Sequence, residues 1–191
     1  MHSGTKYISG HSDVLLGLVT TSPNTKQGKA LNKKLRNIQQ YMGIAPAPFD
    51  IWLTIRGLRT LYCRIEKSCY NAKHIAIFLN NHRLIEHVYY PGFDNRENVV
   101  KKQMKLYGGM LSFDVGNEEL AMAITGSVQV VTRATSLGGT KTLIEHRASI
   151  EPEERRVSPP GLLRLSVGIE DVDDLIDDLQ IAFDVAEKVC S

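Results

Sequence analysis

The chain is organised around residues 2–17, which read HSGTKYISGHSDVLLG. Lys6 directly follows Thr5 and lies close to Ser3, so an amine and two hydroxyl groups stand near one another. Hydroxyl groups hydrogen-bond phosphate oxygens, and a lysine amine can form a Schiff base with a carbonyl compound. The apolar run from Val14 to Leu18 indicates a buried strand. Most lysines are surface charges, so the pattern alone leaves a cofactor role and a surface role both open.

Length and composition favour a soluble globular class. A chain of 191 residues suggests one domain, or one domain plus a fragment. The formal charge of +2 argues against nucleic acid or an anionic membrane as the main partner. No apolar run approaches the ~20 residues of a membrane helix, and no secretory signal is visible at the N-terminus. The three cysteines, Cys63, Cys69 and Cys190, have no metal-type spacing, and we expect free buried thiols in a reducing cytoplasm and no metal site.

Apolar periodicity predicts three long helical regions. Residues 26–42 are expected to form an amphipathic helix, and residues 48–80 a long helical region in which Gly57 indicates a kink or a close contact with another helix. A final helix begins near Asp171. The apolar positions expected in the core of the long helix are Trp52, Ile55, Leu58, Leu61, Tyr62, Ile65, Cys69, Ala72, Ile75, Ala76 and Leu79, and those of the final helix are Leu175, Leu179 and Ala182 or Phe183.

Shorter elements alternate in the second half of the chain. We expect strands at residues 85–90, 110–115 and 128–132, with helices at residues 96–104 and 117–125. Strands separated by helices, with a helix at the end, predict an α/β domain.

Two segments near the N-terminus resemble one known family. Ser3-Gly4-Thr5-Lys6-Tyr7 and Gly10-His11-Ser12-Asp13 are similar to the lysine segment of the Cys/Met-metabolism enzymes that use pyridoxal 5'-phosphate (PLP). This family comprises the cystathionine γ-synthases, cystathionine lyases, methionine γ-lyases and homoserine sulfhydrylases. The resemblance implies that Lys6 is the catalytic Schiff-base lysine and that Ser3 and Thr5 bind the phosphate of PLP.

Later segments extend the resemblance to nearly the whole chain. Thr135-Ser136-Leu137-Gly138-Gly139 resembles the family's Ser-Leu-Gly-Gly loop, and the strand from Arg164 to Gly168 resembles its Arg-hydrophobic-Ser-Val-Gly strand. The resemblance implies that Ser136, Leu137 and Arg164 bind the carboxylate of an amino-acid substrate. The residues alone favour a turn role for Ser136, in which its side chain hydrogen-bonds its own backbone, and only the resemblance makes the binding role an equal alternative. A charge in an apolar strand needs a partner, so Arg164 is either a carboxylate ligand or half of a structural ion pair.

The resemblance also implies a fold and a domain division. The chain matches the C-terminal part of a fold-type I PLP-dependent transferase, with a small mixed or antiparallel sheet packed with helices and one long kinked helix. Residues 1–25 would be a remnant of the large PLP-binding domain, residues 26–80 linking helices, and residues 81–191 the small α/β domain. In the family, the partner of the pyridine nitrogen, the stacking aromatic residue and the phosphate loop precede the lysine segment.

The function implied is that of a PLP-dependent trans-sulfuration enzyme. Its substrates would be cystathionine, methionine or O-acylhomoserine-type amino acids, and its reaction β/γ-elimination or γ-replacement. Thr135 stands where many γ-synthases and γ-lyases carry glutamate, which leaves the reaction open. The alternative is a non-catalytic truncated fragment, or half of a split enzyme that acts with a partner chain. Expected partners are a second copy, as in the family's dimers and tetramers, or a missing N-terminal half.

Overall fold

The computed structural model describes residues 1–94 and 97–190 of the chain. The chain divides into two compact units, Met1–Leu61 and Tyr62–Ser191, which are described separately below. The helix predicted at residues 96–104 appears as α4 (Glu97–Gln103), and its expected first residue, Arg96, lies outside the described residues.

The first unit begins with a short hairpin-like pairing. Strand β1 (His2–Ser3) pairs antiparallel with β2 (Gly17–Leu18), and the π-helix η1 (Gly4–Ile8) follows β1. The buried strand predicted from Val14 to Leu18 is therefore only partly correct. Val14 is buried, but Leu15 is 86% exposed, because the two-residue β1–β2 ladder is too short to place the whole run in a covered sheet.

The predicted helix at residues 26–42 is confirmed as α1 (Lys26–Tyr41). It begins after Thr25, whose side-chain oxygen accepts a hydrogen bond from the Gly28 amide, as an N-cap residue should. No residue of α1 is buried, so its apolar stripe faces no core within the described residues.

The single long kinked helix predicted at residues 48–80 is two helices, α2 (Pro48–Leu58) and α3 (Leu61–Asn80). The amides of Arg59 and Thr60 bond three residues back, and these tighter bonds close the last turn of α2. Gly57 makes the expected close contact, because a Cβ at this position would lie 2.1 Å from the Ser9 carbonyl oxygen.

The predicted core of this region is buried only in the second half of α3. The positions from Cys69 to Leu79 are buried, as predicted. The prediction is wrong for Trp52, Ile55, Leu58 and Tyr62, which are between 45% and 83% exposed, because helical spacing marks an apolar face without showing what covers it.

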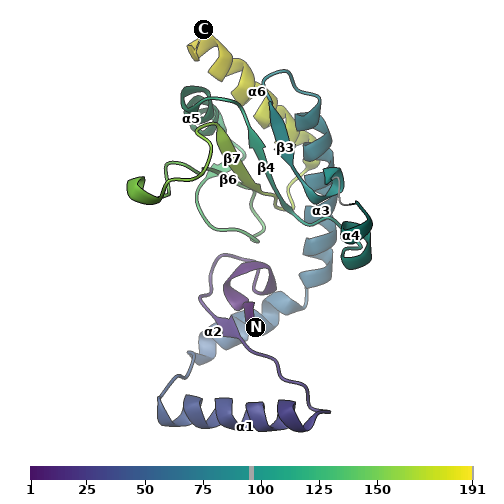
Figure 1. Cartoon of the computed structure of the whole chain (residues 1–191), viewed down its shortest axis with the longest axis vertical. Helices are drawn as coiled ribbons and strands as arrows, with labels where there is room; N and C mark the ends of the chain where they lie inside the picture. Colours follow the sequence, from purple (N-terminus) through teal and green to yellow (C-terminus); the bar gives the residue numbers. More distant parts are fainter. Residues whose placement is uncertain (95–96, 191) are drawn as a thin grey trace. The chain divides into compact units, whose positions relative to one another are not determined.

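The second unit contains a five-stranded sheet (Figure 1). Its strand order is β3-β4-β7-β6-β5, and only the β5–β6 pairing is parallel, which confirms the predicted small mixed sheet. The strands are β3 (His87–Tyr89), β4 (Met110–Asp114), β5 (Thr132–Arg133), β6 (Leu143–His146) and β7 (Leu162–Ser166). The short helices η2 (Pro91–Phe93) and η3 (Glu153–Arg155) lie in the connections.

Three helices cover one face of this sheet: α3, α5 (Glu118–Ser127) and α6 (Val172–Cys190). Alternate strand residues such as Phe113, Leu163 and Ile144 are fully buried against them, as are Leu175 and Leu179. Side chains alternate between the faces of a strand. The intervening residues of β4, β6 and β7 therefore point to the opposite face, which carries the polar groups described below.

The strand predicted at residues 128–132 is mostly absent, because the backbone amides of this segment bind a buried carboxylate. Asp178 on α6 accepts hydrogen bonds from the backbone amides of Gln129, Val130 and Val131, at 2.8, 3.0 and 2.8 Å. Because these amides are directed to one side chain, they do not join a sheet ladder, and β5 begins only at Thr132.

The burial of the three cysteines only partly matches the prediction. Cys69 is buried, but Cys63 and Cys190 are exposed, so the expectation of buried thiols is wrong for these two residues. Cys63 lies near the start of α3, and Cys190 is the last residue of α6. No helix in the described residues is long and apolar enough to cross a membrane.

We predict that Asp178→Asn lowers the free energy of unfolding by about 1.5–3 kcal/mol, because an amide cannot replace a carboxylate that accepts three hydrogen bonds. Asp177→Asn, on the exposed side of the same helix, should change it by less than about 0.5 kcal/mol. Urea unfolding followed by circular dichroism measures both. Equal effects of the two substitutions would show that the three hydrogen bonds to Asp178 do not stabilise the fold.

Candidate functional site

Lys6 lies within η1 in the first unit. Its backbone departs from helical geometry, with φ −92° and ψ −132°, and the side chain is half-buried. The Lys6 carbonyl accepts a hydrogen bond from the Gly10 amide at 2.9 Å, and Gly4 O accepts from the Ser9 amide at 3.0 Å. The turn that carries the lysine is therefore fixed by backbone bonds on both sides of it.

The two hydroxyl residues predicted to bind phosphate line one cavity. Ser3 and Thr5 border a space of about 470 Å³ together with residues of the facing segment, Leu15 to Gly17. The Leu16 amide donates to Thr5 Oγ1 at 2.9 Å, whereas the Thr5 hydroxyl reaches the Leu16 carbonyl only at 3.5 Å. A bond of 3.5 Å is weak, so the Thr5 hydroxyl proton remains suited to a ligand oxygen.

Gly4 suits the close approach of the two segments. A Cβ on Gly4 would lie 3.0 Å from the Leu16 carbonyl oxygen and 3.1 Å from the Leu16 Cβ. The Gly4 amide donates to the same carbonyl at 2.7 Å. Lys6 is not among the residues that line this cavity, so the cavity joins the two hydroxyl groups but not the lysine. Hydroxyl groups suit a phosphate and a lysine amine suits an aldehyde, which are the two groups of PLP that these residues would hold.

The predicted substrate residues meet in the second unit. Arg164 lies in β7, and its Nη2 donates to the Ser136 carbonyl oxygen at 2.8 Å. Two residues further along the strand, Ser166 Oγ accepts from the Gly138 amide at 2.9 Å. Side chains of β7 thus hold both ends of the Ser136-Leu137-Gly138 turn. Lys6 belongs to the other unit.

Ser136 has an unusual backbone conformation. Its φ is +89°, in the left-handed region that favours glycine, and the φ of Gly138 is +78°. A non-glycine residue in this region stores strain and is held there by its surroundings. In this turn the bonds to Arg164 and Ser166 supply that restraint.

Arg164 also forms the ion pair that the sequence left open. Glu145 stands opposite it in the β6–β7 register, and Glu145 Oε2 lies 2.8 Å from Arg164 Nη2. The Glu145 side chain is only 4% exposed. Arg164 Nε is buried and has no hydrogen-bond partner among the described residues. The guanidinium therefore has both a structural partner and an unused donor.

A second arginine shares the same carboxylate. Arg147 Nη1 lies 2.6 Å from Glu145 Oε1, and Arg147 Nη2 lies 3.4 Å from Glu151 Oε1. The hydrogen bond to Glu145 raises the pKa of the Arg147 guanidinium. Two arginines and two glutamates therefore alternate along this face of the sheet.

Glu151 ends this chain of ion pairs. It accepts hydrogen bonds from the Ser158 hydroxyl at 2.6 Å and from the amides of Val157 and Ser158 at 2.9 and 3.0 Å. These bonds, the hydroxyl first, lower the pKa of Glu151 to about 2.

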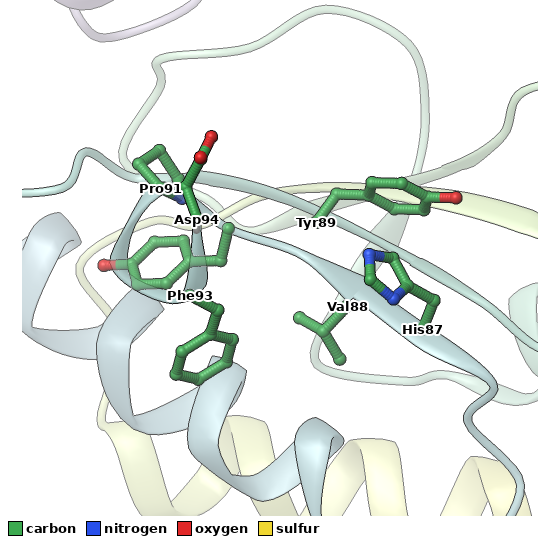
Figure 2. A pocket seen from close by; sticks show the side chains of 7 residues that line it. His87, Val88, Tyr89, Pro91, Phe93 and Asp94 are labelled. Carbon is green, nitrogen blue, oxygen red and sulfur yellow. The ribbon is translucent and has the colours of Figure 1, made fainter. Parts of the chain in front are cut away.

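A separate cavity of about 710 Å³ lies along the edge strand β3 (Figure 2). One continuous stretch lines it, from His87 to Asp94 without Gly92, and the rings of His87 and Tyr89 meet at 4.3 Å between centroids. None of the residues predicted to bind cofactor or substrate belongs to this lining.

Glu145 and Arg147 were missed by the sequence predictions. Their partnership with Arg164 depends on the pairing register of β6 with β7, which residue patterns alone do not define. The only available signal was the need of a strand arginine for a negative partner.

The chain matches proteins of known families. Residues 1–184 match a family model described as Cys/Met metabolism PLP-dependent enzyme. The chain is 42% identical over 188 residues to the cystathionine gamma-lyase of Bacillus subtilis (strain 168), covering 94% of this chain and 48% of that protein. It is 41% identical over 192 residues to the L-methionine gamma-lyase of Fusobacterium nucleatum subsp. polymorphum, covering 94% and 47% respectively.

A solved structure also resembles this chain. The crystal structure of metB from Corynebacterium glutamicum superposes with a TM-score of 0.82 and 38% sequence identity, covering 96% of this chain and 48% of that chain. The chain spans about half the length of the curated relatives it matches.

We predict that Ser136→Val lowers the free energy of unfolding by about 1–3 kcal/mol, because a β-branched residue tolerates positive φ poorly. Ser136→Gly should leave it within about 1 kcal/mol of the wild type, since glycine adopts this φ without strain but loses more entropy on folding. Thermal unfolding of the two variants checks this. If Ser136→Gly proved as destabilising as Ser136→Val, the backbone strain at Ser136 would be disproved.

We predict a pH-dependent contribution from Glu151. Its pKa is about 2 in the folded chain against a usual 4.5, so its stabilisation is fully present above pH 4.5 and disappears as the pH falls toward 2. An NMR titration of the Glu151 carboxyl carbon should give a midpoint near 2. In Ser158→Ala the midpoint should move toward 4.5, because the strongest hydrogen bond is lost. A wild-type midpoint at 4.5 would show that the hydrogen bonds from Val157 and Ser158 do not lower the pKa of Glu151.

Proposed function

Because the chain belongs to the Cys/Met metabolism family of PLP-dependent enzymes, we propose that it is the C-terminal portion of a trans-sulfuration enzyme. Its substrates would be cystathionine, methionine or O-acylhomoserine-type amino acids, and its reaction β/γ-elimination or γ-replacement. The observation that carries the proposal is the continuous match over residues 1–184, which includes both the Lys6 segment and the Arg164 strand.

The cofactor role belongs to Lys6, Ser3 and Thr5. PLP, when bound, supplies an electron sink for the negative charge that develops on the substrate. Lys6 would hold it through the side-chain nitrogen, and the hydroxyl groups of Ser3 and Thr5 would bind its phosphate. The Lys6 amine would also take the proton from the substrate Cα and move protons between Cα and Cβ.

The substrate role belongs to Arg164, Ser136 and Leu137. Arg164 binds the substrate carboxylate, and the unpartnered Nε supports this assignment because a buried donor without an acceptor is costly. The Ser136 carbonyl orients the guanidinium through its hydrogen bond. Leu137 is half-buried beside it in the same turn, where its backbone borders the carboxylate.

Two features bear on the reaction and on the compartment. Thr135 is exposed immediately before the turn, at the position where many γ-synthases and γ-lyases carry glutamate, so this position leaves the choice between elimination and replacement open. The free thiols of Cys63 and Cys190 are exposed, which suits a reducing cytoplasm.

A second candidate follows from the coverage of the relatives. The chain spans about half of them, and large apolar side chains of its first unit are exposed, among them Leu15, Tyr41, Phe49 and Trp52. An exposed apolar surface of this kind is typical of an interaction site. In this case the chain acts only together with an N-terminal half, or with a second copy as in the family's oligomers.

We predict that PLP added to the purified chain gives a saturable visible absorption band that is lost in Lys6→Ala. Lys29→Ala, which removes an exposed lysine of α1, is the matched control and should keep the band. After borohydride reduction, peptide mass mapping should locate the PLP adduct on Lys6. If the wild type and Lys6→Ala behave alike, the cofactor assignment fails for the chain alone, and the second candidate is favoured.

A further inference from the structure

Arg147 has no role in the function proposed above, yet it touches the residue that pairs with Arg164. It is 28% exposed and donates to Glu145 Oε1 at 2.6 Å. Glu145 turns its other oxygen, Oε2, toward Arg164 Nη2 at 2.8 Å. One carboxylate is thus divided between two guanidinium groups.

This division is unusual for an arginine and a carboxylate at such close range. A guanidinium and a carboxylate left to themselves tend to form a fork, with two parallel N–H···O bonds. In the β6–β7 pair the only close ion-pair contact joins Arg164 Nη2 to Glu145 Oε2, and Arg164 Nε stays buried without an acceptor among the described residues. Something must therefore keep Glu145 Oε1 away from Arg164 Nε.

The contacts of Glu145 Oε1 identify the cause. This oxygen is bonded to Arg147, and Arg147 is in turn tied to Glu151, which the Val157 and Ser158 backbone holds in place. Arg147 is thus anchored at both of its terminal nitrogens.

We propose that Arg147 is a positioning residue of the carboxylate site. It occupies one oxygen of Glu145, prevents a fork between Glu145 and Arg164, and so keeps Arg164 Nε available to the carboxylate of an amino-acid ligand. The proposal rests on the proposed role of Arg164 and adds to it a residue that acts through Glu145. Without Arg147, Glu145 would pivot onto both Nη2 and Nε of Arg164 and compete with the ligand.

The electrostatics favour the same role. Arg164, Glu145, Arg147 and Glu151 form one chain of ion pairs whose charges sum to zero. Removing Arg147 leaves one net negative charge beside Arg164, and this charge repels an incoming anion. Both effects weaken carboxylate binding, and both leave ligands without a carboxylate unaffected.

The test is a titration of the full chain, carrying ¹⁵N-labelled arginine, with L-methionine and with L-methioninamide. The Arg164 Nε–H signal is assigned by its loss in Arg164→Lys. In the wild type, L-methionine should shift this signal in a saturable way, whereas L-methioninamide, which lacks the carboxylate, should not.

In Arg147→Gln the dissociation constant for L-methionine should rise at least about tenfold, the equivalent of one charge-assisted hydrogen bond. Arg155→Gln, an exposed arginine of η3, is the matched control and should leave it unchanged. Arg147→Lys keeps one donor to Glu145 Oε1 and should restore most of the affinity. Arg147→Met keeps the apolar stem of the side chain and replaces Arg147→Gln if that variant fails to fold.

The outcomes separate this inference from the proposed function. Unchanged methionine affinity in Arg147→Gln or Arg147→Met, or no recovery in Arg147→Lys, overturns the positioning role and leaves Arg164 as the carboxylate ligand. No shift at Arg164 Nε in the wild type overturns both the positioning role and that assignment. The attachment of PLP to Lys6 is read by absorption and mass mapping, so it stands or falls independently.

Discussion

A buried carboxylate must be compensated, and Glu145 shows how the sheet meets this requirement. Its side chain is 4% exposed, and leaving such a charge without partners would cost several kcal/mol. The β6–β7 register places Arg164 directly opposite, and the following loop returns Arg147 to the other oxygen. The polar face of the sheet, the strained turn at Ser136 and the loop that carries Glu151 are all connected to this pair. The turn at Ser136 and the loop that carries Glu151 are thereby fixed to one pair of strands, β6 and β7.

The sequence predicted the elements whose signals are local. The helices α1 and α6, the strand β4 and the buried positions of α3 follow from apolar periodicity and capping residues. The family resemblance, confirmed by the match over residues 1–184, located the Lys6 segment and the Arg164 strand, for which periodicity gave no function. Their roles in binding cofactor and substrate remain predictions.

The failures share a physical origin, namely dependence on distant partners. Residues 128–131 look like a strand, but their amides are used by Asp178 of α6. The apolar residues of α2 have helical spacing, but Trp52 and Ile55 are exposed in this chain. Glu145 gave no local signal of its own, because its role depends on the strand register that brings Arg164 opposite it. A pattern in one segment cannot report the partner that another segment supplies.

The three hydrogen bonds from residues 129–131 to Asp178 also affect the order in which the chain folds during synthesis. A ribosome releases residues 129–131 well before Asp178, which lies 47 to 49 residues later in the chain. Until α6 emerges, these amides have water as their partner, and the segment that leads into β5 is open to proteases and chaperones. Closure of this part of the second unit is therefore a late step, timed by the arrival of the C-terminal helix.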